Sequence, residues 1–210
     1  GPFRKKSQQL NVRAFLNGFR NRNLRAAAFG YFGHMWELYA FWAFLPVLLI
    51  TYKDQHPGVE FNVPLLSFCV IASGGFSCAF GGILSLYFGP QKIATIALFL
   101  SGLCCLCSPL FLSWNSFPIL LTFLLLWGLA VTADSPLFST LVAQNAPEES
   151  RGTSLTIVNC IGFAITIISI QLMKVLSEHM QIRYMFMILA IGPALGLTAL
   201  FKNKDQHTLR

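Results

Sequence analysis

The chain alternates between long apolar segments and short polar ones. Since about 20 mainly apolar residues suffice to cross a bilayer as a helix, the apolar segments predict six membrane spans: Leu24–Tyr52, Val63–Phe88, Ile93–Leu112, Phe117–Gln144, Gly152–Met173 and Arg183–Phe201. The connections are short and contain helix breakers such as Gly89-Pro90. The pattern therefore predicts an all-α membrane protein in which consecutive helices are antiparallel.

Composition supports this prediction. Charged residues make up 11% of the chain and hydrophobic residues 55%, whereas a soluble globular protein has roughly 25% charged residues. The six cysteines all fall in apolar segments, where cysteine behaves as a small hydrophobe. We therefore expect no disulfide, no metal site and no cofactor.

Basic residues predict the orientation. Twelve of the 15 Lys and Arg residues flank one side of the predicted spans, so both termini are expected to be cytoplasmic. Residues 1–23 form a basic segment with an amphipathic stripe at Val12, Phe15, Leu16 and Phe19 that is expected to lie on the inner leaflet. Residues 202–210 form a cytoplasmic tail. Topology accounts for the net charge of +7, so no nucleic-acid partner is expected.

Two acids lie deep within the predicted spans. A charged side chain at the bilayer centre costs about 2.5–3.5 kcal/mol on insertion scales, so such residues usually have a function. Glu37 and Asp134 lie 13 and 11 residues from the cytoplasmic ends of the first and fourth spans, or roughly 20 and 16 Å deep. The first and fourth helices are therefore expected to face each other. Pro136 removes a backbone donor and should break the fourth helix beside Asp134.

Other polar residues accompany these acids. His34 lies one turn from Glu37, and Tyr31 one turn before His34. Asn159 stands between Thr156 and Thr166 in the fifth span, where interhelical hydrogen bonding is expected first and cavity lining second. We interpret Glu37, His34, Asp134, Tyr31 and Asn159 as a proton or substrate pathway. The alternative is a structural hydrogen-bonded pair of His34 and Glu37.

Three features resemble the C-terminal half of a major facilitator superfamily transporter. The first is six spans after a basic amphipathic segment. The second is "GGILSLYFGPQK", which resembles the family's loop motif and retains Gly82, Leu84, Ser85, Gly89 and Lys92, although Leu86 and Tyr87 replace its charged pair. The third is "PEESRGTSL" before the fifth span. The resemblance assigns a conformational role to Gly82, Ser85, Gly89 and Lys92.

The resemblance also implies an architecture. It implies two inverted three-helix repeats, Leu24–Leu112 and Phe117–Phe201, whose first helices line a central cavity. The third and sixth helices are then expected on the lipid-facing outside. Because the sequence does not begin with Met, it is expected to be a fragment whose partner is a missing N-terminal six-helix half. "GYFGHMWELYAFW" resembles the seventh helix of some bacterial transporters, which implies a bacterial inner membrane.

The expected function is secondary active transport of a small solute by alternating access, coupled to protons as a symporter or antiporter. The spans contain no Lys or Arg at mid-depth, which favours protons, cations or neutral solutes over anions. One alternative is a rhomboid-like intramembrane enzyme using a serine of "ASGGFS", but no membrane-embedded histidine follows it. The other alternative is a non-transporting assembly or receptor-like membrane protein.

Overall fold

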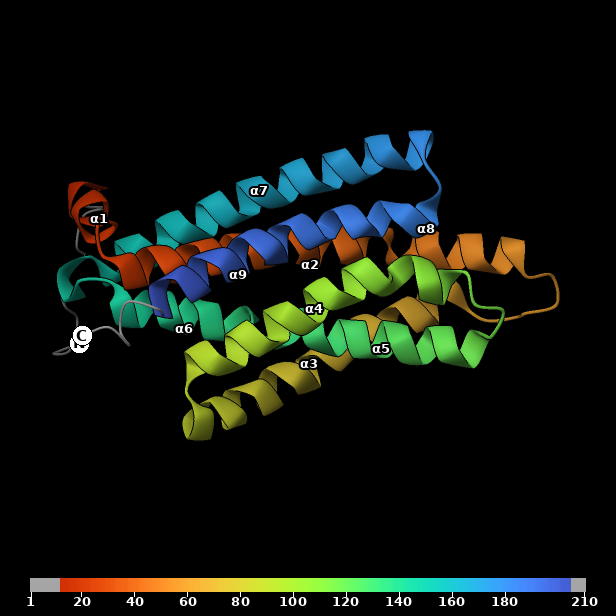
Figure 1. The fold of residues 1–210 in the computed structure, drawn as a ribbon, viewed down its shortest axis with the longest axis horizontal. Coiled ribbons are helices and arrows are strands. Elements are labelled where there is room, and N and C mark those ends of the chain that lie inside the picture. Colours follow the sequence, from red (N-terminus) through yellow and green to blue (C-terminus); the bar gives the residue numbers. More distant parts are fainter. Residues whose placement is uncertain (1–11, 205–210) are drawn as a thin grey trace, which may run out of the picture.

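The structure, a computed structural model, describes residues 12–204, and these form a bundle of long helices (Figure 1). It contains six helical segments long and apolar enough to cross a membrane, which confirms the all-α membrane fold. The elements are α1 Val12–Gly18, α2 Arg22–Gln55, α3 Val63–Phe88, α4 Pro90–Leu112, α5 Phe117–Ala133, α6 Ser135–Asn145, η1 Glu148–Ser150, α7 Arg151–His179, α8 Ile182–Met185, η2 Phe186–Ala190 and α9 Ile191–Lys204.

Helix α2 is the central element of the bundle. It packs against α9, α7 and α6, and 56% of the residues in its most apolar stretch are buried. Its closest neighbour is α9, because Gly33 and Gly192 face each other and a Cβ atom on either would collide with the other's carbonyl oxygen. Gly192 and Gly196 form a Gly-x-x-x-Gly pattern, which lets membrane helices approach to backbone contact.

The fourth span is broken where the sequence predicts a break. Helix α5 ends at Ala133, Asp134 is the junction, and α6 begins at Ser135 with Pro136 in its first turn. Pro136 has no N–H for the Thr132 carbonyl. That oxygen accepts hydrogen bonds from the Asp134 backbone N–H and from the Cys78 thiol of α3, the latter at 3.3 Å. The junction residue and the neighbouring helix thus together satisfy the backbone group that the proline leaves open.

The sixth span begins irregularly. The α-helical turn of α8 is followed by the 3₁₀ segment η2 before the regular helix α9. Pro193 accounts for this irregular start. It has no backbone N–H to donate to the Leu189 carbonyl four residues earlier, and its ring crowds that oxygen. The Pro193 ring packs on α4 at Gly102, where a Cβ atom would lie 2.8 Å from it.

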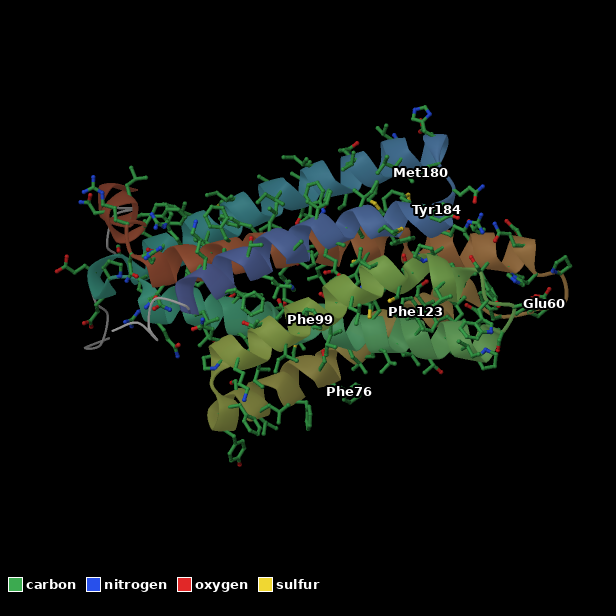
Figure 2. The ribbon with its side chains drawn as sticks, viewed as in Figure 1. Glu60, Phe76, Phe99, Phe123, Met180 and Tyr184 are labelled. Carbon is green, nitrogen blue, oxygen red and sulfur yellow. The ribbon has the colours of Figure 1, made fainter. Side chains whose placement is uncertain are left out.

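The outer faces of the bundle are apolar. Helices α3 and α7 are the least covered spans, since only 22% of the residues in the most apolar stretch of each are buried. Phe76 on α3 projects away from the bundle, and 79% of its surface is exposed (Figure 2). Helix α4 has two faces, one carrying exposed Phe99 and Leu103 and one buried. The third and sixth helices, which were expected on the lipid-facing outside, thus each have a covered face, because 39% and 44% of their most apolar stretches are buried.

The basic N-terminal segment is described from α1 onward. Phe15 is buried and its ring lies 5.3 Å from that of Phe19, whereas Leu16 is exposed. Part of the amphipathic stripe thus packs on the bundle, whereas Leu16 stays exposed at its surface. The tail beyond Lys204 and residues 1–11 lie outside the described part of the chain, so their predicted positions stay predictions.

Candidate functional site

Glu37 is completely buried in the middle of α2. Its Oε1 accepts hydrogen bonds from the Trp127 indole N–H at 2.8 Å and the Cys105 thiol at 3.2 Å. Its Oε2 accepts one from the Ser101 hydroxyl at 2.8 Å. Hydrogen bonds to a charged group contribute about 1.5–3 kcal/mol each, so the three donors offset much of the cost of burying a carboxylate.

Aromatic rings hold the Trp127 donor in place. The Trp127 ring stacks on Phe41 of α2 with 4.4 Å between centroids, and the ring of Phe186 meets it edge to face at 5.7 Å. Trp127 belongs to α5, whereas Ser101 and Cys105 belong to α4. Glu37 therefore ties three spans together inside an apolar shell.

Ser101 can serve Glu37 in two protonation states. The Ser101 hydroxyl also lies 3.1 Å from the Leu98 carbonyl of its own helix. When Glu37 is ionised, the hydroxyl donates to Oε2. When Glu37 is protonated, the hydroxyl can donate to the Leu98 carbonyl and accept a hydrogen bond from the Glu37 carboxyl O–H. Because a serine hydroxyl is one rotatable donor with two acceptor sites, neither state leaves a buried polar atom unpaired at this position.

A second buried pair lies one turn away. His34 Nδ1 on α2 is 2.8 Å from Asp134 Oδ1, and both side chains are at most 1% exposed. The ring centroids of Tyr31 and Phe138 each lie 6.2 Å from that of His34. This contact is an ion pair and not a hydrogen bond with good geometry, because none of the polar side-chain atoms of His34 and Asp134 has a hydrogen-bond partner among the described residues. Buried polar atoms without hydrogen bonds are costly, so burying this pair lowers the stability of the bundle unless the ion pair compensates.

The partners of the buried acids differ from the sequence-based picture. His34 and Glu37 share α2 but not a hydrogen bond, because His34 lies in ion-pair contact with Asp134 whereas Glu37 accepts hydrogen bonds from α4 and α5. The alternative of a structural hydrogen-bonded pair of His34 and Glu37 is therefore not the arrangement in the structure. Neither acid contacts the outside, since Glu37 and Asp134 have no exposed surface.

The remaining pathway candidates line the contact between α2 and α7. Tyr31 is buried and packs on Gly162, where an added Cβ would lie 2.6 Å from the Tyr31 ring. Asn159 is half-buried one turn before Gly162. Thr166 donates to the Met35 carbonyl of α2 at 3.1 Å, which confirms interhelical hydrogen bonding for one member of this stripe.

The four motif residues lie around the junction of α3 and α4: Gly82 and Ser85 near the end of α3, Gly89 between the helices, and Lys92 in the first turn of α4. Gly89 has φ of +83°, a conformation that a side chain disfavours, and its N–H bonds to Ser85 O at 2.9 Å. Ser85 itself donates to Gly82 O at 2.7 Å, and Lys92 Nζ lies 5.4 Å from the Phe88 ring centroid. The motif thus builds a tight turn. The exposed Leu86 and Tyr87 supply no charged latch there.

Sequence reasoning missed Ser101, Cys105 and Trp127. Ser101, Cys105 and Ser108 do form a small polar stripe on one face of α4, but serine and cysteine are ordinary packing residues in spans. Trp127 gave a stronger signal, because a buried indole N–H usually has a hydrogen-bond partner.

Taken together, the fold and the buried acids define a multi-pass integral membrane protein with ionisable groups in its interior. The family model described as Major Facilitator Superfamily matches residues 20–209. The chain therefore belongs to the major facilitator superfamily, a family of membrane transporters of small solutes. A search of curated proteins found no match to the chain.

Proposed function

We propose that the chain is the C-terminal half of a secondary active transporter that moves a small solute by alternating access and couples this movement to protons. The observation that carries the proposal is the Glu37 site, in which Ser101 can satisfy either protonation state. A proton carrier must be stable in both states at some point of its cycle. Glu37 is the primary proton site in this proposal.

His34 and Asp134 form the second site of the proposal. Asp134 lies at the helix break between α5 and α6, and irregular backbone at membrane depth usually lines protein interiors or water-filled cavities. A small movement of α6 relative to α5 would separate Asp134 from His34. Asp134 then becomes a second protonation or substrate-binding group, with Tyr31 and Asn159 beside the pathway.

Alternating access requires a second unit against which this one moves. We assign that role to an N-terminal six-helix half, and we place both termini on the cytoplasmic side of a bacterial inner membrane because of the basic residues at that end of the bundle. The turn at Gly82, Ser85, Gly89 and Lys92 is the proposed conformational motif. Because no Lys or Arg lies at mid-depth, the favoured solutes are cationic or neutral.

The competing enzyme function has little support. Ser73 and Ser77 of the "ASGGFS" segment donate to carbonyl groups of their own helix, at 2.7 and 2.9 Å. Within the described residues, these bonds occupy the hydroxyl protons that a general base would have to remove. A receptor-like or assembly role would leave the two-state Glu37 site without a purpose.

Proton flux tests the proposal directly. The full-length transporter, containing both halves, would be reconstituted in proteoliposomes that enclose a pH-sensitive dye. A panel of small cationic and neutral solutes would then be added outside. We expect at least one solute to drive a protein-dependent pH change, abolished by Glu37→Gln. Solute flux that proceeds with no pH change would disprove proton coupling, and absence of any solute flux would disprove transport.

A further inference from the structure

A small pocket with three basic residues lies where α2 begins and α9 ends. It has a volume of about 210 Å³ and is lined by Arg22, Arg25, Ala26, Phe29, Ala199 and Lys202. This volume is below the roughly 300–1,000 Å³ of pockets for drug-sized ligands. The pocket therefore suits a compact group rather than a large solute.

The charge of this pocket is uncompensated within the described structure. The ion pairs of the described residues are His34–Asp134 and Lys53–Glu60, so Arg22, Arg25 and Lys202 pair with no described acid. Among the described residues, no Asp or Glu lines the pocket. Three cations drawn from two helices thus face one small space, and the ligand that fits is an anion.

The position of the pocket selects the kind of anion. Both helices that form it are candidate membrane spans, and the pocket lies at their shared end. This is the level at which lipid head groups begin. Phe29, which is 47% exposed, and the small side chains of Ala26 and Ala199 provide an apolar wall. Phe29 follows Arg25 by one helical turn, or about 6 Å along the axis.

We propose that this pocket binds the phosphate of an anionic phospholipid between α2 and α9. The phosphate oxygens accept hydrogen bonds from the guanidinium groups of Arg22 and Arg25 and from the Lys202 ammonium. Arginine forks match phosphate geometry, and basic pockets between membrane helices bind anionic head groups. The acyl chains then run along Phe29 into the hydrocarbon layer. The bound lipid would hold the ends of α2 and α9 together.

Lipid retention tests the site. The chain would be placed in phosphatidylcholine nanodiscs containing a minor fraction of phosphatidylglycerol, and bound lipids would be titrated by native mass spectrometry. Each basic residue near an anionic head group contributes roughly fivefold in binding. We therefore expect phosphatidylglycerol affinity to fall about fivefold in Lys202→Gln and about 25-fold in Arg22→Gln/Arg25→Gln. Lys202→Arg should retain it.

Two controls separate this site from general attraction. Arg20→Gln removes the same charge from an exposed residue at the same end of the bundle that does not line the pocket, and it should leave the affinity unchanged. If Arg20→Gln weakens binding as much as Lys202→Gln, or if phosphatidylcholine is retained equally well, the specific site does not exist. Soluble glycerol phosphate should not displace the lipid, and full displacement would show that the pocket binds a free phosphate instead.

Discussion

Asp134 lies opposite His34, with 2.8 Å between Oδ1 and Nδ1, and not opposite Glu37. The depths along the helices explain this pairing. His34 lies ten residues inside the expected span start at Leu24, which is roughly 15 Å, and Asp134 lies roughly 16 Å inside its own span. Glu37, one turn deeper, instead reaches the level of Ser101, Cys105 and Trp127.

The first prediction concerns the energy of the His34–Asp134 pair. Removing one partner of a buried pair leaves the other uncompensated and costs about 3–5 kcal/mol. We expect His34→Leu and Asp134→Leu each to lower the free energy of unfolding in detergent by this amount. The double variant should cost less than the sum, with a coupling of at least about 1 kcal/mol. Strictly additive losses in this double-mutant cycle would show that the two side chains do not interact.

Hydropathy predicted the spans well because it measures the preference of side chains for an apolar environment, which the interior of the bilayer provides. The second predicted span forms helix α3, which has the predicted bounds Val63–Phe88. Helix α7, however, continues to His179, six residues beyond the predicted Met173. The extra turns contain Lys174, Ser177 and Glu178, which suit water rather than hydrocarbon. A helix can continue after it leaves the apolar layer, so hydropathy locates the layer and not the helix end.

The site was predictable only in part, and the reason is chemical. Acids are rare within spans, so Glu37 and Asp134 were conspicuous in the sequence. Their partners were less so, because a serine, a cysteine and a tryptophan all occur in spans for packing alone. The sequence also placed His34 and Glu37 on one helix face without revealing which neighbouring helix each side chain meets. That depends on the α2–α9 contact, which fixes the rotation of α2 within the bundle.

The second prediction concerns the Trp127 indole. Trp127→Phe keeps an aromatic ring on Phe41 but removes the N–H that bonds to Glu37 Oε1. We expect the free energy of unfolding to fall by about 1.5–3 kcal/mol, the contribution of a hydrogen bond to a charged group. Trp114→Phe is the matched control, since Trp114 is 47% exposed and outside the site. Equal effects of the two substitutions would mean that the Trp127 N–H contributes nothing specific.

The third prediction concerns the close approach of α2 and α9. Gly33→Ala places a methyl group against the Gly192 carbonyl, and neither backbone can yield as a side chain would. Overpacking of this kind costs typically about 1–3 kcal/mol, and a backbone collision belongs at the upper limit. Gly75→Ala is the same change in open space and should be neutral or slightly stabilising. Thermal unfolding in detergent compares them, and a Gly33→Ala protein as stable as Gly75→Ala would contradict the contact.

The fourth prediction concerns Glu37 itself. The substitution Glu37→Gln mimics the protonated glutamate, because the new amide oxygen can accept from Trp127 and Cys105 while the amide nitrogen donates to Ser101, which turns to Leu98. The variant should therefore fold with little loss of stability. It cannot release a proton, so proton-driven accumulation of solute should be abolished while exchange of solute across the membrane continues.

A matched acid supplies the control for this last experiment. Glu60 is 81% exposed beside Lys53, and Glu60→Gln should accumulate solute as the unmodified transporter does. Both variants would be assayed in proteoliposomes of the full-length protein, with and without an imposed pH gradient. Loss of exchange as well as accumulation in Glu37→Gln would assign Glu37 to solute binding instead of proton coupling. Normal accumulation with an unchanged pH dependence would make Glu37 a structural residue, because a transporter that loses its proton site cannot keep its proton drive.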